Sequence, residues 1–268
     1  MRSRLILVAL ALLTVPLLAA PLMQPARTAV AVLRFDNNTA DSRYDNLGRA
    51  LSTMMITDLS VVEEIQLVER ERLEDLRAEL QLQQSGYVDP ETAVTVGLLV
   101  GAEYVVTGAF LTVDPEMRLD TRIVRVETSE IIKTAEVSGP SNQLLDLQER
   151  LAEEFIDGLA IALTEQDRER LRAQREANGI ADIETALAFS TALCLLDNGA
   201  YVEALEEMEE VRRAAPGSTI VQLTMDRLQD RLQDEARDRL KNEASRRIGG
   251  LLGRRNREPA PPPRPVGC

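Results

Sequence analysis

The chain offers few side chains for catalysis or metal binding. It contains no histidine and only two cysteines, Cys194 and Cys268, among 268 residues. Histidine is the commonest general base near neutral pH and the commonest zinc ligand, so its absence argues against catalytic triads and most transition-metal sites. Carboxylates remain, but no two acids are framed by the glycine-rich or aromatic elements that a carboxylate-pair hydrolase would need. We therefore expect a non-enzymatic protein with no catalytic residue, no metal and no cofactor.

The two cysteines stand in different surroundings. Cys194 lies within the apolar helical run 192–196, which favours the role of a small buried hydrophobic residue. Cys268 is the last residue, and an exposed terminal thiol in an oxidising compartment could pair with a second molecule.

A polar stretch, Asp36-Asn37-Asn38, follows the apolar strand that begins at residue 29 and leads into a helix near Leu47. Its oxygens could coordinate a hard cation, but one Asp and two Asn without further ligands favour a hydrogen-bonded turn. A second candidate is Tyr201, which follows an Asn-Gly turn at 198–199. We take Asp36, Asn37, Asn38 and Tyr201 as the candidate partner-binding residues.

The first 26 residues resemble a secretory leader. Arg2 and Arg4 precede an apolar run from Leu5 to Leu18, which is shorter than the roughly 20 residues of a membrane span. We predict a signal peptide over residues 1–26 and a periplasmic protein, with an uncleaved anchor and outer-membrane association as the alternatives. No cysteine lies near the leader, so a lipid anchor is not expected.

Composition argues against nucleic acid as a partner. The net charge is −13, and the chain has four Phe, four Tyr and no Trp. Phosphate neutralisation needs basic residues, and base stacking needs aromatic ones.

The hydrophobic spacing predicts an α/β (α+β) domain over residues 28–164. Strands are expected at about 29–35, 65–70, 104–113, 117–126 and 131–137, and helices at about 47–59, 71–84, 90–101 and 144–163. The order is therefore β-α-β-α-α-β-β-β-α, and the last three strands, joined by short turns, form an antiparallel meander. At the end of the second strand, Arg70 is expected to reach a nearby carboxylate.

The remainder of the chain is predicted to be helical. Residues 165–177 are dense in mixed charge, which indicates a solvated connector over 165–181. Residues 182–247 hold a helix, the Asn-Gly turn, a second helix and a long third helix from Thr219 with Leu223 and Leu240 in its apolar stripe. Residues 248–268 are rich in Arg and Pro, and this composition predicts a disordered tail.

Several motifs in the first domain carry a resemblance to a known family. They are Val-Ala-Val-Leu-x-Phe-x-Asn at 30–37, Leu47-Gly48, Leu67-Val68-Glu69-Arg70, the helix 73–79, and Leu-Leu-Val-Gly-Ala-Glu-Tyr-Val-Val-Thr-Gly at 98–108. In this order they resemble the core domain of the CsgG family, which includes the curli secretion channel, and its three-layer fold is shared with the N-terminal domain of TolB and with LpoB-type activators. Residues 184–217 are similar to one tetratricopeptide repeat, whose small residues let two helices approach closely.

The resemblance implies a non-catalytic envelope protein in the assembly or secretion of a surface polymer such as curli-type fibres. The turns at 114–116 and 127–130 leave no room for membrane-inserting hairpins, so no transmembrane barrel is expected. We expect a periplasmic accessory or ring component that binds other envelope proteins, with a homo-oligomer as an alternative. The alternative is an LpoB-like regulator of a peptidoglycan synthase, which would also act by protein binding.

Overall fold

The computed structural model of the protein describes residues 27–79, 90–161, 163–251 and Cys268. The predicted signal peptide, and the predicted tail apart from Cys268 and residues 248–251, lie outside the described residues. In the described ranges, no helix combines the length and the hydropathy needed to cross a bilayer.

A six-stranded sheet forms the centre of the first part of the chain. Its strands are β1 (Thr28–Val32), β2 (Asp36–Asn37), β3 (Ile65–Leu67), β4 (Tyr104–Val113), β5 (Glu116–Arg125) and β6 (Glu130–Pro140). The spatial order is β3-β1-β4-β5-β6, and β2 pairs with β4. β1 is parallel to β3 and β4, whereas β4, β5 and β6 form an antiparallel meander. The predicted α/β class and the predicted meander are confirmed.

The polar stretch after the first strand is a correction to the sequence analysis. Asp36 and Asn37 form the short strand β2, which pairs in parallel with Ala109 and Phe110 of β4. The sequence predicted a turn here because all three residues are polar. The backbone continues along β4 because Asn38 N–H also donates to the Phe110 carbonyl at 2.8 Å, so sheet pairing overrides the local turn preference.

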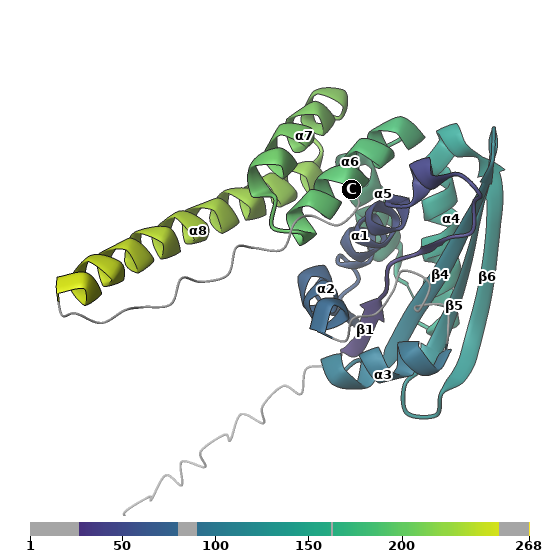
Figure 1. The fold of residues 1–268 in the computed structure, drawn as a ribbon. Coiled ribbons are helices and arrows are strands. Elements are labelled where there is room, and N and C mark those ends of the chain that lie inside the picture. The colour runs from purple at the N-terminus through teal and green to yellow at the C-terminus, as the bar shows by residue number, and fades with distance from the viewer. Residues whose placement is uncertain (1–26, 80–89, 162, 252–267) are drawn as a thin grey trace, which may run out of the picture.

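Helices cover both faces of the sheet (Figure 1). α1 (Leu47–Leu59) and α4 (Leu144–Gly158) bury Leu51, Met54 and Phe155 against one face. α2 (Arg70–Glu79) and α3 (Pro90–Val100) pack on the other, around Leu33 and Val105. Alternate residues of β1 enter the two cores, as the period of two in a strand requires. The three-layer arrangement predicted for this part of the chain is therefore present.

One glycine allows the first helix to approach the sheet. A Cβ atom on Gly48 would lie 1.8 Å from the carbonyl oxygen of Phe35. Only glycine can occupy this position without moving the backbone of the strand segment.

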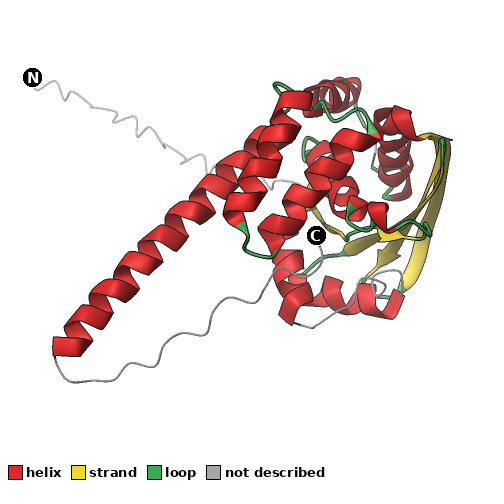
Figure 2. Ribbon diagram, turned by 45° about the horizontal axis from the view of Figure 1, so that its top comes forward, coloured by secondary structure: helices red, strands yellow, loops and turns green. Residues whose placement is uncertain are grey.

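In the described residues after α4, the chain forms four further helices: α5 (Glu165–Asn178), α6 (Ile183–Asp197), α7 (Tyr201–Ala214) and α8 (Thr219–Leu251). α6 packs on α1, and α7 packs on α6 and α8. Figure 2 shows the long helix α8 extending from the group of helices beside the sheet. The main core runs without a break from the sheet into these helices, since Phe189, Met208 and Leu228 belong to the same buried cluster as Phe110. The expected helix-turn-helix is present, with Gly199 in the left-handed conformation at the turn.

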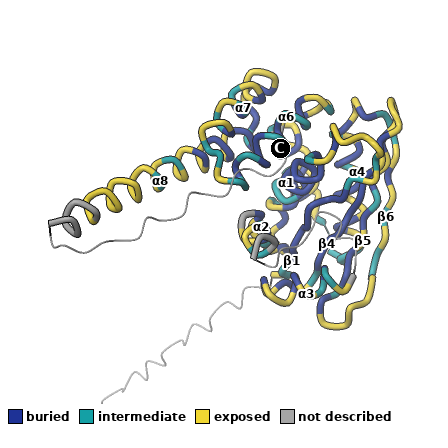
Figure 3. Tube along the Cα trace, viewed as in Figure 1, coloured by how far each residue is buried: buried dark blue, intermediate teal, exposed yellow. Residues whose placement is uncertain are grey.

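α8 changes its environment along its length. Ile220, Val221 and Leu228 are buried, but nearly all residues from 229 to 245 are exposed and the helix projects away from the body (Figure 3). Leu223 and Leu240 are exposed, so the predicted apolar stripe is wrong at these two positions. Leu240 lies on the part of α8 beyond its packed beginning, whereas Leu223 lies within the packed beginning and is exposed there.

Candidate partner-binding cleft

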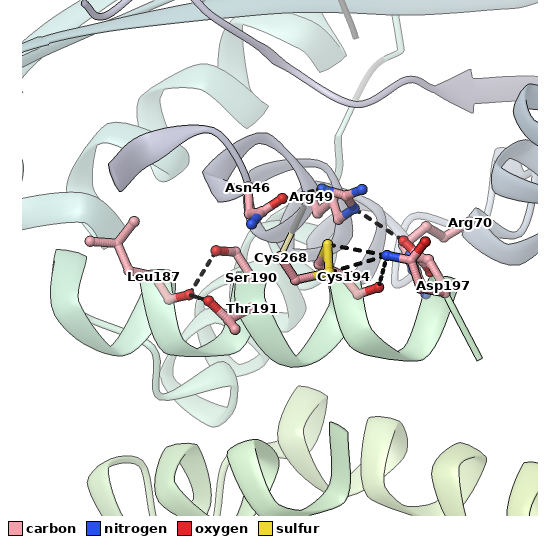
Figure 4. Close-up of a disulfide and its surroundings, with 10 residues drawn as sticks. Asn46, Arg49, Arg70, Leu187, Ser190, Thr191, Cys194, Asp197 and Cys268 are labelled. Atoms are coloured by element: carbon pink, nitrogen blue, oxygen red, sulfur yellow. Dashed lines mark hydrogen bonds and ion pairs between the residues drawn. A yellow bond between two sulfur atoms is a disulfide. The ribbon is translucent and has the colours of Figure 1, made fainter. Parts of the chain in front are cut away.

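A buried ion-pair cluster joins the C-terminal helices to the α/β layers. Asp197, the last residue of α6, accepts from Arg70 Nη1 at 2.7 Å and from Arg49 Nε at 3.2 Å. The side chain of Asp197 is 7% exposed, and both arginines are 5% exposed. Arg49 comes from α1 and Arg70 from the first turn of α2, and Figure 4 shows both side chains converging on the carboxylate. Three helices therefore meet at one charge cluster, which we call the Asp197 cluster.

The electrostatics of the cluster are set by burial. The pKa of the Asp197 carboxyl is raised, chiefly because the group is withdrawn from water, and Glu74 acts in the same direction. Arg70 and Arg49 oppose this shift by stabilising the carboxylate. The sequence predicted that Arg70 reaches a nearby carboxylate, and the structure supplies one from 127 residues away in the chain.

A cleft of about 370 Å³ lies beside the Asp197 cluster. α2 supplies one wall, the exposed beginning of the projecting part of α8 supplies the other, and Tyr201 lies at the start of α7 between them. The lining is mostly charged and comprises Glu69, Arg70, Glu74, Asp75, Leu196, Asp197, Tyr201, Arg227, Asp230, Arg231 and Asp234. Carboxylates outnumber guanidinium groups in this list, so the cleft is suited to a polar partner surface that carries basic groups.

The cysteines correct the sequence analysis. Cys194 and Cys268 form a disulfide with a Cα–Cα distance of 5.9 Å. Cys194 is buried, as predicted, but it is not a free hydrophobic residue, and Cys268 is bonded within the chain instead of to a second molecule. Asn198 Nδ2 donates to the Cys194 carbonyl at 2.9 Å and lies 3.1 Å from Cys268 Sγ (Figure 4). The sequence held a usable signal, because two cysteines in an exported chain are often paired.

The predicted partner-binding residues fall in two separate places. Tyr201 is partly buried and lines the cleft, whereas Asn38 is exposed and lines a second hollow of about 430 Å³ on the open face of β4–β6. Asp36 is buried, and Asn37 is engaged locally, with Nδ2 donating to Asp45 Oδ1 at 2.9 Å and Oδ1 accepting from Thr39 N–H at 2.8 Å. The structure therefore does not bring the 36–38 stretch together with Tyr201.

The second hollow is lined by an ion-pair network on the sheet. Arg118 Nη2 lies 2.8 Å from Asp120 Oδ1 and 2.9 Å from Glu136 Oε2. These groups are about half exposed and already pair with one another, so they gain little from a further charged partner. Within the described residues, no group of His, Cys, Asp or Glu is arranged to hold a metal ion.

Sequence reasoning missed most of the cleft. Asp197, Arg49 and the α8 acids were not singled out, because nothing in the chain marks which surface of α8 faces α2. One signal was present: Asp197 ends an otherwise apolar helix, and a charge at that point must lie beside its own partner if it is buried.

Comparison with known proteins finds a family match in the first part of the chain. The family described as "Curli production assembly/transport component CsgG" matches residues 17–115. The comparison with curated proteins gives no match. Similar solved structures include the LpoB C-terminal domain from Salmonella enterica, with 21% identity over 44% of this chain and 86% of that one and a TM-score of 0.37. Lipoprotein GNA1162 from Neisseria meningitidis has 14% identity over 51% and 99%, with a TM-score of 0.38. The PelC dodecamer from Paraburkholderia phytofirmans has 14% identity over 50% and 92%, with a TM-score of 0.29.

Proposed function

From the match of residues 17–115 to the CsgG family, we propose that the protein is a non-catalytic component of the cell envelope that acts in the assembly or secretion of a surface polymer such as curli-type fibres. The match agrees with the resemblance predicted from the sequence for this part of the chain. It works by binding other proteins, as a periplasmic accessory or ring component without a pore of its own. The family match is the observation that carries this proposal.

The disulfide supports an exported location. Such bonds persist in oxidising compartments, which include the bacterial periplasm, and are rare in the cytosol. The Cys194–Cys268 bond therefore agrees with the signal peptide predicted from the first 26 residues.

The short turns of the meander support an accessory role. β4 and β5 are separated only by Asp114 and Pro115, and β5 and β6 by residues 126–129. These connections contain no insertion, and Arg118 and Asp120 are about half exposed on the central strand. The short connections and the half-exposed charged side chains are both typical of a sheet face that is in contact with water.

The cleft beside the Asp197 cluster is the surface we assign to partner binding. It combines an aromatic side chain, Tyr201, with a net negative lining, and it lies between helices from both halves of the chain. Tyrosine is enriched at protein interfaces because it offers a rigid apolar body and a polar tip. A protein that docks here would contact α2, α7 and α8 at once.

Complementation in the producing organism tests the proposal. A strain that lacks this protein is expected to lose its surface polymer, measured by quantitative dye binding and electron microscopy, and the full chain is expected to restore it. Tyr201→Ala combined with Asp230→Lys should fail to restore it, whereas Leu240→Ala, on the exposed part of α8, should restore it. An unchanged surface polymer in the deletion strain would refute the proposed function, and a fall in peptidoglycan synthesis instead would favour the synthase-regulator alternative.

A further inference from the structure

The disulfide lies close in the sequence to residues that line the cleft. Cys194 and Asp197 are on the last turn of α6, Asn198 is its C-cap, and Tyr201 is the first residue of α7. We propose that the redox state of the Cys194–Cys268 bond regulates the shape of the cleft, so that the oxidised protein holds the partner-binding conformation. The inference relies on the proposed function only for the use of the cleft.

Asn198 connects the sulfur atoms to the end of the helix. Its side-chain Nδ2 lies 3.1 Å from Cys268 Sγ and 3.5 Å from Cys194 Sγ, and it donates to the Cys194 carbonyl at 2.9 Å. Its backbone N–H donates to the same carbonyl at 3.1 Å. Removing the Cys268 sulfur therefore alters the contacts of the residue that ends α6.

The neighbouring residue transmits this change to the cleft. Asp197 precedes Asn198 and holds Arg70 of α2, and both Asp197 and Arg70 line the cleft. On the other side of Asn198, the chain turns through Gly199 and Ala200 to Tyr201. A displacement of the α6 terminus thus reaches the α2 wall through one ion pair and Tyr201 through two residues.

The disulfide also closes a covalent loop that contains the second wall. The two cysteines are 74 positions apart, and the loop includes all of α7 and α8. Arg227, Asp230 and Arg231 of the cleft belong to this loop. Cleavage of the bond releases that constraint on α8, while the buried contacts of Leu228 and Val221 keep its base attached.

The bond is open to a reductant from one side. Cys268 is exposed and Cys194 is fully buried, so one thiolate of a dithiol reductant attacks Cys268 Sγ. The S–S bond breaks, its electron pair goes to Cys194 Sγ, and that thiolate takes a proton from water. The second thiol of the dithiol then attacks the mixed disulfide and releases Cys268 as a thiol. The protein disulfide is reduced to two thiols, and the dithiol is oxidised to its own disulfide.

Fluorine NMR of the full chain tests the proposal. The protein has four tyrosines, so labelling with 3-fluorotyrosine gives few resonances, and Tyr201→Phe assigns the one in the cleft. Tyr44 and Tyr104, which lie in the α/β layers, serve as internal references. Addition of a dithiol is expected to shift the Tyr201 resonance by more than its linewidth and to leave the references in place. Cys268→Ser should give the reduced spectrum without a dithiol and should not respond to one.

Two results would overturn the inference. One is a Tyr201 resonance that does not move when mass spectrometry shows complete reduction. The other is a joint shift of the Tyr201, Tyr44 and Tyr104 resonances with loss of helical circular dichroism. This result would show that the disulfide stabilises the whole fold and does not control the cleft locally. The spectra are recorded on the protein alone, so either result leaves the polymer assay of the proposed function unaffected.

Discussion

Replacement of Asp197 by Asn removes the negative charge of the Asp197 cluster while keeping the shape of the side chain. Arg49 and Arg70 would then remain 5% exposed without the carboxylate that they share. Removing one partner of a buried ion pair typically costs about 3–5 kcal/mol, because the remaining charge is left desolvated. The raised pKa of Asp197 shows that its own carboxylate is also costly to bury, so the neutral Asn recovers part of this free energy and the figure is an upper bound. For a chain of this size, each kcal/mol lowers the melting temperature by about 2–4 °C, so a decrease of at most roughly 6–20 °C is expected.

Thermal and urea unfolding followed by circular dichroism measure this loss. The matched control is Asp238→Asn, the same substitution at an ion pair with Lys241 whose partners are 67% and 68% exposed. Exposed pairs contribute about 0–1 kcal/mol, so the control should unfold almost with the wild type. A loss below about 1 kcal/mol for Asp197→Asn would show that water reaches the cluster, and it would refute our account of how α6 is fixed to α1 and α2.

Three further predictions follow from single features. Cys268→Ser, or reduction, should destabilise the protein by about 2–4.5 kcal/mol in urea unfolding, where the upper value is the loop entropy for a separation of 74 residues, and an unchanged midpoint would contradict this. Gly48→Ala should cost about 3 kcal/mol or more, because its Cβ would collide with the Phe35 carbonyl; a wild-type melting temperature would disprove the close approach. The Asp167 carboxyl has a lowered pKa because Thr164 donates to it, so it stabilises the fold above the ordinary pKa of 3.8 and this contribution is lost as pH falls through the lower folded value. Asp167→Asn should therefore be less stable than wild type at pH 6 and converge with it in strong acid, and a constant difference across that range would count against the assignment.

The strands and most helices of the first domain could be predicted because their signals are local. The strand at 104–113 has the bounds predicted from its apolar run, and the helix before it ends at Val100, one residue before Gly101, whose φ of 72° explains the choice of glycine. Asp36 and Asn37 were predicted wrongly because their strand pairing depends on β4, which is more than 70 positions away. Local polarity favours a turn there, and only the sheet reveals the strand.

The site was less predictable because it is built from long-range contacts. Arg70 carried a signal, since a charge at the junction of a strand and a helix needs a counter-charge, but nothing nearby identified Asp197 as that counter-charge. The bond between Cys194 and Cys268 was missed because an apolar helical run is equally typical of a free buried cysteine. In both cases the residue type was informative, and the partner was decided by the packing of α6 on α1.

The packing also explains how one repeat-like helix pair is stable without neighbouring repeats. Such pairs usually need stacked copies, because each exposes an apolar surface on both sides. Here α1 covers α6 and the first third of α8 covers α7, so both surfaces are buried by helices of the same chain. α8 is far longer than is needed to cover α7. Among the described residues, its continuation past Leu228 has no buried apolar residue. The cleft forms where α8 runs past α2, and its lining brings charged residues of both helices together with Tyr201.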